Sequence, residues 1–462
     1  MNLYLHILQL EGYQWKHFLT WVFGHLWIRK LGNKKPLVWT AKATFLYYSS
    51  FVLTGILTLL VFLLSESILY SAVIFVFLLF QPWIPLLFSL ALIKPYEIWN
   101  KVKTIQDTRI KVDSLPNLQV IGITGSFGKT SVKEFLYQIL RSKYKVLKTP
   151  ESYNTVFGIS RVVDLELDNS FDFFICEMGA YQRGEIAELA RMVKPKYGIL
   201  TGIAEQHLER FGSLENIISG KFELIEALPQ DGFAVLNVDS TPIKNSLKKV
   251  SVPYWSYGQD EKAEVRVEKI KLSIDGSRFV LVTPSGKFSL HTKLVGFSAI
   301  QNIAGAAAMS LCLGVSPIKI TRAVTNLEPV PARLEIIKQG ELTILNDSFN
   351  SNPEGFREAL ETASLIKSKF KVLITPGIVD LGARSIEIHK GLGKLASRVF
   401  DLAILVTDSG RTRGLETGLL SAKFEKEKII FVQTLNEAMQ ILREKAKPGT
   451  LVLLENDLPD NF

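Results

Sequence analysis

The feature that most constrains this 462-residue chain is a glycine-rich turn between two short segments of different character. Residues 118–124 form an apolar run typical of a buried strand, and residues 129–140 have the spacing of a helix. The turn, Gly125-Ser-Phe-Gly128, leads directly into Lys129 and Thr130. A strand that turns through glycines into a helix is typical of an α/β domain with a mainly parallel sheet.

Phosphate recognition is the chemistry that such a turn predicts. Glycines allow backbone N–H groups to face phosphate oxygens, and the helix N-terminus adds a favourable dipole. Lys129 would reach the β- and γ-phosphates, and Thr130 would bind Mg²⁺. The strict pattern has glycine where this chain has Ile123, but the position between strand and helix compensates. The predicted nucleotide contacts in this segment are Gly125, Ser126, Gly128, Lys129, Thr130 and Ser131.

The α/β pattern continues towards the C-terminus. Further strands are expected at 171–177, 197–202, 233–237, 342–346, 371–375, 402–407, 429–432 and 450–454. Helices are expected at 300–313, 354–367 and 435–445, and the alternation in 265–294 predicts a small antiparallel sheet. A proline-bearing linker at 328–332 separates two α/β units. We therefore predict a central P-loop ATPase-type domain at 113–328 and a C-terminal Rossmann-like domain at 329–462.

Residues 1–112 differ in composition from the rest of the chain. No charged residue occurs in 43–65 or in 67–93, and only Glu66 separates these runs. Each run is long enough as a helix to cross a hydrocarbon core of roughly 30 Å. We therefore predict an N-terminal transmembrane helical hairpin, the alternative being a buried hairpin of a soluble protein. Residues 13–23 would form a helix that either lies in the membrane interface or packs on the hairpin.

The distribution of charge is consistent with a membrane anchor. The net charge is +9, and residues 1–112 contribute 11 Lys and Arg against 4 Asp and Glu. These basic residues flank the hairpin on both outer sides, which places both of its ends in the cytoplasm. The sequence thus predicts a multi-pass protein of the cell membrane, in contact with lipid, with cytoplasmic catalytic domains. Because the remaining chain is nearly neutral, no nucleic-acid partner is expected.

Several segments in a fixed order extend the phosphate-loop signal. They are Ile123-Thr-Gly-Ser-Phe-Gly-Lys-Thr-Ser-Val-Lys-Glu134, Glu151-Ser-Tyr-Asn-Thr-Val-Phe-Gly158, Glu177-Met-Gly-Ala180, His207-Leu-Glu-Arg-Phe-Gly-Ser213, Lys221-Phe-Glu223 and Asn346-Asp-Ser-Phe-Asn-Ser-Asn-Pro353. Together with Asn302 and Arg333 they resemble the Mur ligases, from about residue 118 to the C-terminus. The resemblance implies an ADP-forming ligase that uses ATP and Mg²⁺ to join a carboxylate to an amine through an acyl phosphate.

The resemblance also implies roles for individual residues. Glu177, which ends a predicted strand, and His207 would hold Mg²⁺ together with Thr130. Lys221 would be carbamylated by CO₂ and would support a second metal, which requires a lowered pKa. Otherwise Lys221 is an exposed helix lysine. The predicted catalytic residues are therefore Lys129, His207 and Lys221.

Two domains share the remaining implied roles. Asn302 would contact adenine, while Arg333 and Asp347 would reach the phosphates or ribose from the C-terminal domain, so catalysis implies domain closure. The implied substrate contacts are Asn154 for the acceptor and Asn350, Asn352, Asp380 and His389 for the amino component. Asn350 and Asn352 are equally typical of a turn before Pro353.

The chain departs from the family's pattern mainly at the amino-substrate end. Ser298 stands for a usual His, Ala332 for a usual Gly, Asn346 for a usual Asp, Phe349 for a usual Tyr and Asp380 for a usual Glu. The apolar helices are expected to replace the family's N-terminal UDP-binding domain.

Three functions are consistent with these patterns. The first is a ligase that adds D-alanyl-D-alanine, or another amino acid or dipeptide, to a UDP- or lipid-linked peptidoglycan precursor peptide. The second is a ligase of another polymer, such as a polyglutamate-type synthase, and the third is a degenerate nucleotide-binding scaffold. The extended motif at 346–353 favours the first function. Joint retention of Lys129, Thr130, Glu177, His207 and Lys221 argues against the third.

Overall fold

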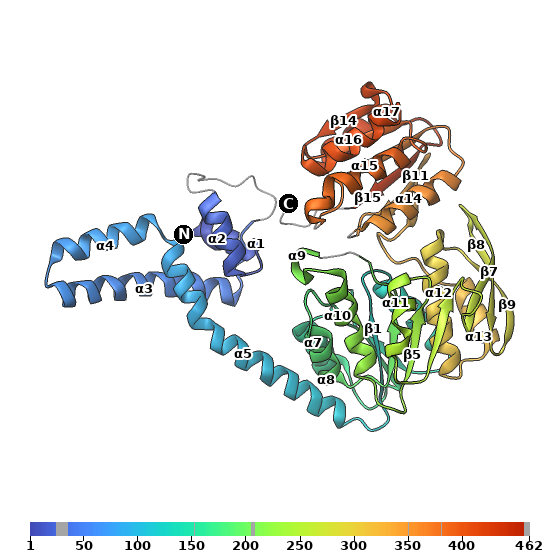
Figure 1. Ribbon diagram of the computed structural model, residues 1–462, viewed down its shortest axis with the longest axis horizontal. Coiled ribbons are helices and arrows are strands. Elements are labelled where there is room, and N and C mark those ends of the chain that lie inside the picture. Colours follow the sequence, from blue (N-terminus) through green and yellow to red (C-terminus); the bar gives the residue numbers. More distant parts are fainter. Residues whose placement is uncertain (25–35, 152, 205–207, 350, 380, 457–462) are drawn as a thin grey trace. The chain divides into compact units, whose positions relative to one another are not determined.

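The computed structural model describes residues 1–24, 36–151, 153–204, 208–349, 351–379 and 381–456 (Figure 1). The described chain divides between Lys103 and Thr104 into two compact units. The first unit is helical, and the second contains two α/β domains, each with its own sheet.

The first unit is a small helical assembly. Its helices are α1 (Asn2–Leu10), α2 (Trp15–Gly24), α3 (Ala41–Ser65), α4 (Ile68–Phe80) and the first part of α5 (Trp83–Asp113). Its core contains Leu5, Phe18, Leu46 and Leu86, none of which is exposed. Because Phe18 belongs to α2, this helix packs on α3 and α5. Of the two arrangements predicted for residues 13–23, the structure therefore shows the helix packed on its neighbouring helices.

The predicted transmembrane hairpin is not formed as two consecutive straight spans. Among the described helices, only α3 is by itself long and apolar enough to cross a membrane. The predicted second span, 67–93, is broken into α4 and α5, which are bent by 81°. Pro82 lies at the break, lacks an N–H and disfavours a helical conformation at Gln81, the C-cap residue that follows α4. The prediction of a multi-pass location in the cell membrane is therefore wrong.

The central domain is built on a nine-stranded sheet in the order β2-β3-β1-β4-β5-β6-β7-β8-β9. Its strands are β1 (Gln119–Thr124), β2 (Val146–Lys148), β3 (Phe173–Glu177), β4 (Tyr197–Leu200), β5 (Phe233–Asn237), β6 (Tyr254–Gly258), β7 (Val265–Ser273), β8 (Gly276–Thr283) and β9 (Gly286–Thr292). The pairs from β2 to β6 are parallel, as expected for strands joined by helical crossovers. The pair of β6 and β7 is also parallel, although only residues 259–264 connect these two strands. The antiparallel strands β7, β8 and β9 continue this sheet rather than forming a separate one.

Helices cover both faces of this sheet. One face packs against α6 (Lys129–Leu140), α12 (Phe297–Cys312) and α13 (Pro317–Thr325). The other packs against α7 (Val156–Glu166), α8 (Glu185–Val193) and α10 (Leu214–Glu226), and Figure 1 shows α10 and α12 on opposite sides of β1. Shorter elements are α9 (Leu208–Phe211), α11 (Thr241–Ser246) and the 3₁₀ helix η1 (Leu247–Lys249).

The C-terminal domain has a six-stranded sheet in the order β10-β11-β15-β12-β13-β14. Its strands are β10 (Glu335–Gln339), β11 (Leu342–Asp347), β12 (Lys371–Thr375), β13 (Leu402–Val406), β14 (Ile429–Val432) and β15 (Leu451–Glu455). Only the pair of β10 and β11 is antiparallel among these described strands. The helices are α14 (Pro353–Leu365), α15 (Ser385–Ala396), α16 (Gly410–Ser421), α17 (Leu435–Lys445), η2 (Gly382–Arg384) and η3 (Lys426–Lys428). The predicted α/β fold class is confirmed for both domains.

The strand ends position the predicted site residues. β1 ends at Thr124, directly before the glycine turn, and β3 ends at Glu177. Because these two strands are adjacent and parallel, the turn and the carboxylate lie at the same edge of the sheet. In the other sheet, β11 ends at Asp347. Open α/β sheets bind ligands at these carboxyl ends.

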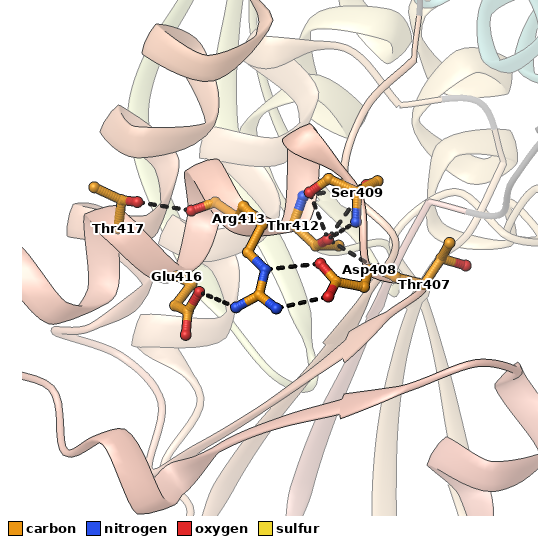
Figure 2. Close-up of polar contacts among 7 residues, drawn as sticks. All are labelled: Thr407, Asp408, Ser409, Thr412, Arg413, Glu416 and Thr417. Atoms are coloured by element: carbon orange, nitrogen blue, oxygen red, sulfur yellow. Dashed lines mark hydrogen bonds and ion pairs between the residues drawn. The ribbon is translucent and has the colours of Figure 1, made fainter.

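A local network of side chains fixes the beginning of α16 (Figure 2). The Ser409 hydroxyl accepts a hydrogen bond from the Thr412 N–H, and the Thr412 hydroxyl accepts one from the Ser409 N–H at 2.9 Å. Arg413 donates two hydrogen bonds to Asp408 and one to Glu416. The reciprocal pair satisfies backbone donors that have no partner within the helix.

Replacing Ser409 with Ala is expected to lower the free energy of unfolding by about 1 kcal/mol, because the Thr412 N–H loses its acceptor. The matched control is Thr417→Ala, which removes an exposed methyl group and a hydroxyl that donates to the Arg413 carbonyl in the same helix. Its expected effect is below about 0.5 kcal/mol, as for most surface changes. Urea unfolding followed by circular dichroism measures both variants, and equal losses would contradict the assigned cap.

Candidate active site

The glycine turn after β1 is a tight cradle. Gly125 has φ +156° and Gly128 has φ +78°, conformations that favour glycine. A Cβ on Gly125 would collide with Thr201 Oγ1, and one on Gly128 would lie 2.5 Å from Asn302 Oδ1. The Ser126 N–H donates to the Gly202 carbonyl at 2.7 Å. The turn is therefore packed against neighbouring residues. Because its glycines carry no side chain, a phosphate chain can approach the backbone of the turn closely.

Lys129, the first residue of α6, folds back over this cradle. Its ammonium donates to the carbonyl oxygens of Gly125 at 2.9 Å and Ser126 at 3.4 Å. Burial lowers the pKa of Lys129, while the nearby Glu177 carboxylate acts in the opposite direction. A desolvated ammonium beside bare backbone fits the phosphates of a nucleotide, since their oxygens are strong acceptors for charged donors.

Glu177 is a buried carboxylate beside the same turn and is only 1% exposed. Its Oε1 accepts from Asn154 Nδ2 at 3.2 Å, and its Oε2 lies 3.3 Å from the Lys133 ammonium. Burial raises the pKa of Glu177, but the charges of Lys133 and Lys129 together with hydrogen bonds from Asn154 and Thr130 hold the pKa below its ordinary value. Its Oε2 is buried and accepts no well-directed hydrogen bond from the described residues, and its charged partner is the Lys133 ammonium.

The Glu177 carboxylate has the oxygen ligands that suit a Mg²⁺ site completed by the nucleotide. No group of three or more His, Cys, Asp or Glu side chains in the described part of the chain could hold a metal. Mg²⁺ commonly takes only one or two protein ligands together with phosphates and water. Glu177 and the Thr130 hydroxyl are suited to that role. His207, the other predicted ligand, lies outside the described residues.

Lys221 on α10 is buried, so the alternative of an exposed helix lysine is excluded. The residue is 4% exposed, and its ammonium donates to the Ala180 carbonyl at 3.3 Å. The same nitrogen lies 5.6 Å from the centre of the Phe211 ring. Burial, reinforced by the Lys129 charge, lowers the pKa of Lys221 to about 7. Much of this side chain is therefore an uncharged amine at neutral pH.

A cavity of about 710 Å³ lies beside the phosphate loop. Among the described residues, six of the predicted site residues line it, namely Gly128, Ser131, Asn302, Arg333, Asp347 and Asn352. Leu294, Phe297 and Val330 supply apolar lining. Its volume is in the range of small-molecule sites, and it combines apolar walls with a few polar groups as such sites do. Both α/β domains contribute to the lining.

Arg333 connects the C-terminal side of this cavity to the phosphate loop. Its guanidinium donates to the Thr130 hydroxyl at 3.1 Å and lies 4.5 Å from the centre of the Phe349 ring. Asp347 accepts a hydrogen bond from the Leu334 N–H at 3.0 Å. Burial raises the pKa of Asp347 to about 6, although this hydrogen bond and the Arg333 charge oppose the rise. Cation and carboxylate are thus placed beside the predicted nucleotide contacts of the other domain.

Two predicted substrate residues have structural partners. Asn352 lines the cavity, but its Oδ1 also accepts from the N–H groups of Glu354 and Gly355 and so caps α14. His389 is fully buried and is not part of the cavity lining. Its Nδ1–H donates to the Ser385 carbonyl at 2.6 Å, and its Nε2 accepts from the Ile378 N–H at 2.8 Å.

Burial lowers the pKa of His389 to about 4, so the ring is neutral and holds the backbone near residue 378. Asn154 contacts Glu177 instead of the cavity. Asn350 and Asp380 lie outside the described residues.

Two functional candidates escaped the sequence interpretation. Lys133, the partner of Glu177, lies one helical turn after Lys129, and this spacing was an available signal. Glu358 lines the cavity and accepts a hydrogen bond from the Ser298 N–H, 60 residues away. Nothing in the sequence distinguishes Glu358 from Glu361 on the same helix.

Comparisons with known proteins identify the family. Residues 123–310 match the Mur ligase middle domain, and residues 332–455 match the Mur ligase glutamate ligase domain. The chain is 30% identical over 318 residues to UDP-N-acetylmuramoyl-tripeptide–D-alanyl-D-alanine ligase of Escherichia coli, covering 67% of this chain and 70% of that protein. It belongs to the Mur ligase family. This Mur ligase is an ATP-dependent, ADP-forming enzyme.

Other Mur ligases agree in sequence and fold. The enzyme of the same name from Bacillus subtilis is 27% identical over 339 residues, or 73% of this chain and 72% of that protein. The structure of MurF from Acinetobacter baumannii is 25% identical, with a TM-score of 0.68 and 77% coverage of both chains. Folylpolyglutamate synthase from Mycobacterium tuberculosis shares the fold at 16% identity and a TM-score of 0.59, covering 76% of this chain and 92% of that one.

Replacing Lys133 with Met is expected to destabilise the Mur ligase by about 3–5 kcal/mol, because the Glu177 carboxylate would stay buried without its partner. Lys148→Met is the matched control, since Lys148 pairs with Glu134 while remaining 26% exposed. The control is expected to lose less than about 1 kcal/mol. Chemical unfolding monitored by tryptophan fluorescence gives the free energy of unfolding of both variants. If Lys133→Met lowered it no more than Lys148→Met does, the buried pair of Lys133 and Glu177 would not be important for stability.

Proposed function

We propose that this Mur ligase adds D-alanyl-D-alanine to a UDP-N-acetylmuramoyl-tripeptide, with conversion of ATP to ADP and phosphate. The observation that carries the proposal is the cavity in which the phosphate loop faces Arg333 and Asp347 of the C-terminal domain. This arrangement supports phosphoryl transfer followed by attack of a second substrate. The similar proteins of Escherichia coli and Bacillus subtilis carry this reaction in their names.

The reaction would proceed in two steps. A carboxylate oxygen of the tripeptide attacks the γ-phosphorus, and the bond between phosphorus and the ADP oxygen breaks. The amine of the dipeptide then attacks the acyl carbon and loses a proton, while phosphate leaves with the bonding electron pair. Lys129 and the turn N–H groups would hold the phosphates, and Arg333 would offset charge on the transferred group. Mg²⁺ bound by Glu177, Thr130 and His207 would neutralise the phosphate oxygens.

The two other functions receive less support. A polyglutamate-type ligase would use the same nucleotide site, but the likeness to folylpolyglutamate synthase extends to the fold alone. A degenerate scaffold would not need the buried Glu177 and Lys221 beside a half-buried Lys129 around one turn, because burying ionisable groups is unfavourable.

A reconstituted reaction tests the proposal. Protein supplied with ATP, Mg²⁺, the UDP-linked tripeptide and D-alanyl-D-alanine is expected to release ADP and form a pentapeptide, detected by mass spectrometry. Lys129→Ala is expected to lower kcat at least about 100-fold, because a charged phosphate contact is lost. Glu444→Gln, at an exposed position of α17, is the control expected to retain activity.

A parallel reaction with a lipid-linked tripeptide and single amino acids separates the possible acceptors and donors. Product only with another amino component would sink the proposed donor, and ADP release without any amide would sink ligation.

We also propose that Lys221 is carbamylated, which would convert its buried amine into an anionic group near the phosphate loop. Its pKa of about 7 means that the neutral amine, the form that attacks CO₂, increases as pH rises through 7. With ¹³C-bicarbonate, a carbamate NMR signal is therefore expected to be stronger at pH 8 than at pH 6.

Lys221→Arg is the matched variant, because arginine keeps its positive charge and stays protonated. It is expected to lose the carbamate signal and at least about 100-fold in kcat. An unchanged signal in this variant would show that the modified residue is another one.

A further inference from the structure

The N-terminus of α12 has an unusual source of capping. Its N-cap residue is Gly296, which offers no side-chain acceptor to the first turn. The Ser298 N–H instead donates to Glu358 Oε1, and Glu358 belongs to α14 in the C-terminal domain. Free N–H groups at a helix start favour an anionic partner. The cap of this central-domain helix is therefore supplied by the other domain.

The contact between Glu358 and the start of α12 leaves little space between the two domains. Gly296 has φ +90°, and a Cβ there would lie 2.9 Å from Leu334 Cδ1 and 3.0 Å from Glu358 Oε1. Glycine therefore allows the C-terminal domain to approach the start of α12. Burial raises the pKa of Glu358 to about 7, although hydrogen bonds from Ser298 oppose the rise. Either protonation state leaves Oε1 able to accept, so the contact does not depend on full ionisation.

The same helix carries a nucleotide contact one turn further on. Asn302 follows Ser298 by four residues and thus lies on the same face of α12. Its Oδ1 rests against Gly128 of the phosphate loop, and both residues line the cavity. Glu358 lines this cavity as well. A continuous path of contacts therefore runs from α14 through the first turn of α12 to the phosphate loop.

We propose that Glu358 is a positioning residue that caps α12 from the C-terminal domain and thereby holds the phosphate loop in register with Arg333 and Asp347. Glu358 acts through Ser298 and Asn302 and not on the reacting atoms. Small displacements of bound groups lower the rate of a catalysed reaction. Loss of the contact between Glu358 and Ser298 is therefore expected to lower kcat measurably. The kinetic part of this inference rests on the proposed function.

Two variants and a control test the proposal. Glu358→Ala removes the acceptor, Glu358→Gln keeps an oxygen in the same place without the charge, and Glu444→Gln changes an exposed carboxylate of the same domain. Hydrogen–deuterium exchange of residues 297–300 reports directly on the cap. Glu358→Ala is expected to exchange about tenfold faster there, as for the loss of one hydrogen bond, and Glu358→Gln within about threefold of the original protein.

Kinetics then separate positioning from general stability. In Glu358→Ala, kcat for ligation is expected to fall about tenfold, while the dissociation constant for Mg²⁺ and a non-hydrolysable ATP analogue, measured by calorimetry, changes less than about threefold. Glu358→Gln is expected to restore most of kcat. Unchanged exchange at 297–300, or an undiminished kcat in Glu358→Ala, would overturn the proposal. If no variant ligates, the exchange result still decides the cap, and only the proposed function fails.

Discussion

The burial of lysine side chains around one glycine turn is the constraint on which this site depends. Lys133 and Lys221 are almost inaccessible to solvent, and Lys129 folds over the turn beside them. Charged groups this deep need partners, since desolvation alone is strongly unfavourable. Glu177 pairs with Lys133 and is also the nearby negative charge that acts on Lys129, so one carboxylate serves both lysines. Nucleotide phosphates, and a carbamate on Lys221, are the groups that would restore the balance.

The two α/β domains supply different parts of the same site. The central domain provides the bare backbone of the turn and the Glu177 carboxylate, both at strand ends of one sheet. The C-terminal domain provides Arg333, Asp347 and Glu358 from a loop, a strand end and a helix. Neither set is complete without the other, so an ATP-dependent ligase of this kind needs the domains held together while the nucleotide is bound.

Much of the fold follows from local sequence patterns. The helix at 129–140 and the strands at 233–237, 371–375 and 429–432 have the predicted bounds because apolar spacing and flanking turns define them. β2 has only three residues, too few for a pattern, and β10 is a half-exposed edge strand. The run at 67–93 was misjudged because its apolar composition concealed the break at Pro82. An apolar composition indicates that a segment can be buried in lipid, but it does not show whether the segment is one continuous helix. Proline decides this, because it lacks an N–H and its ring clashes with the preceding turn.

The sequence by itself determined the phosphate turn and the order of motifs that identifies the Mur ligases. The backbone conformation of a glycine turn and the start of the helix after it depend on a few adjacent residues. They can therefore be predicted from the sequence of those residues. Tertiary structure alone decided that Lys133 faces Glu177 across 44 positions and that Glu358 caps α12 across 60. It also decided that Lys221 is buried and that both ring nitrogens of His389 form hydrogen bonds with backbone groups. Burial and partners depend on how distant elements pack, and they set the charge state of each group.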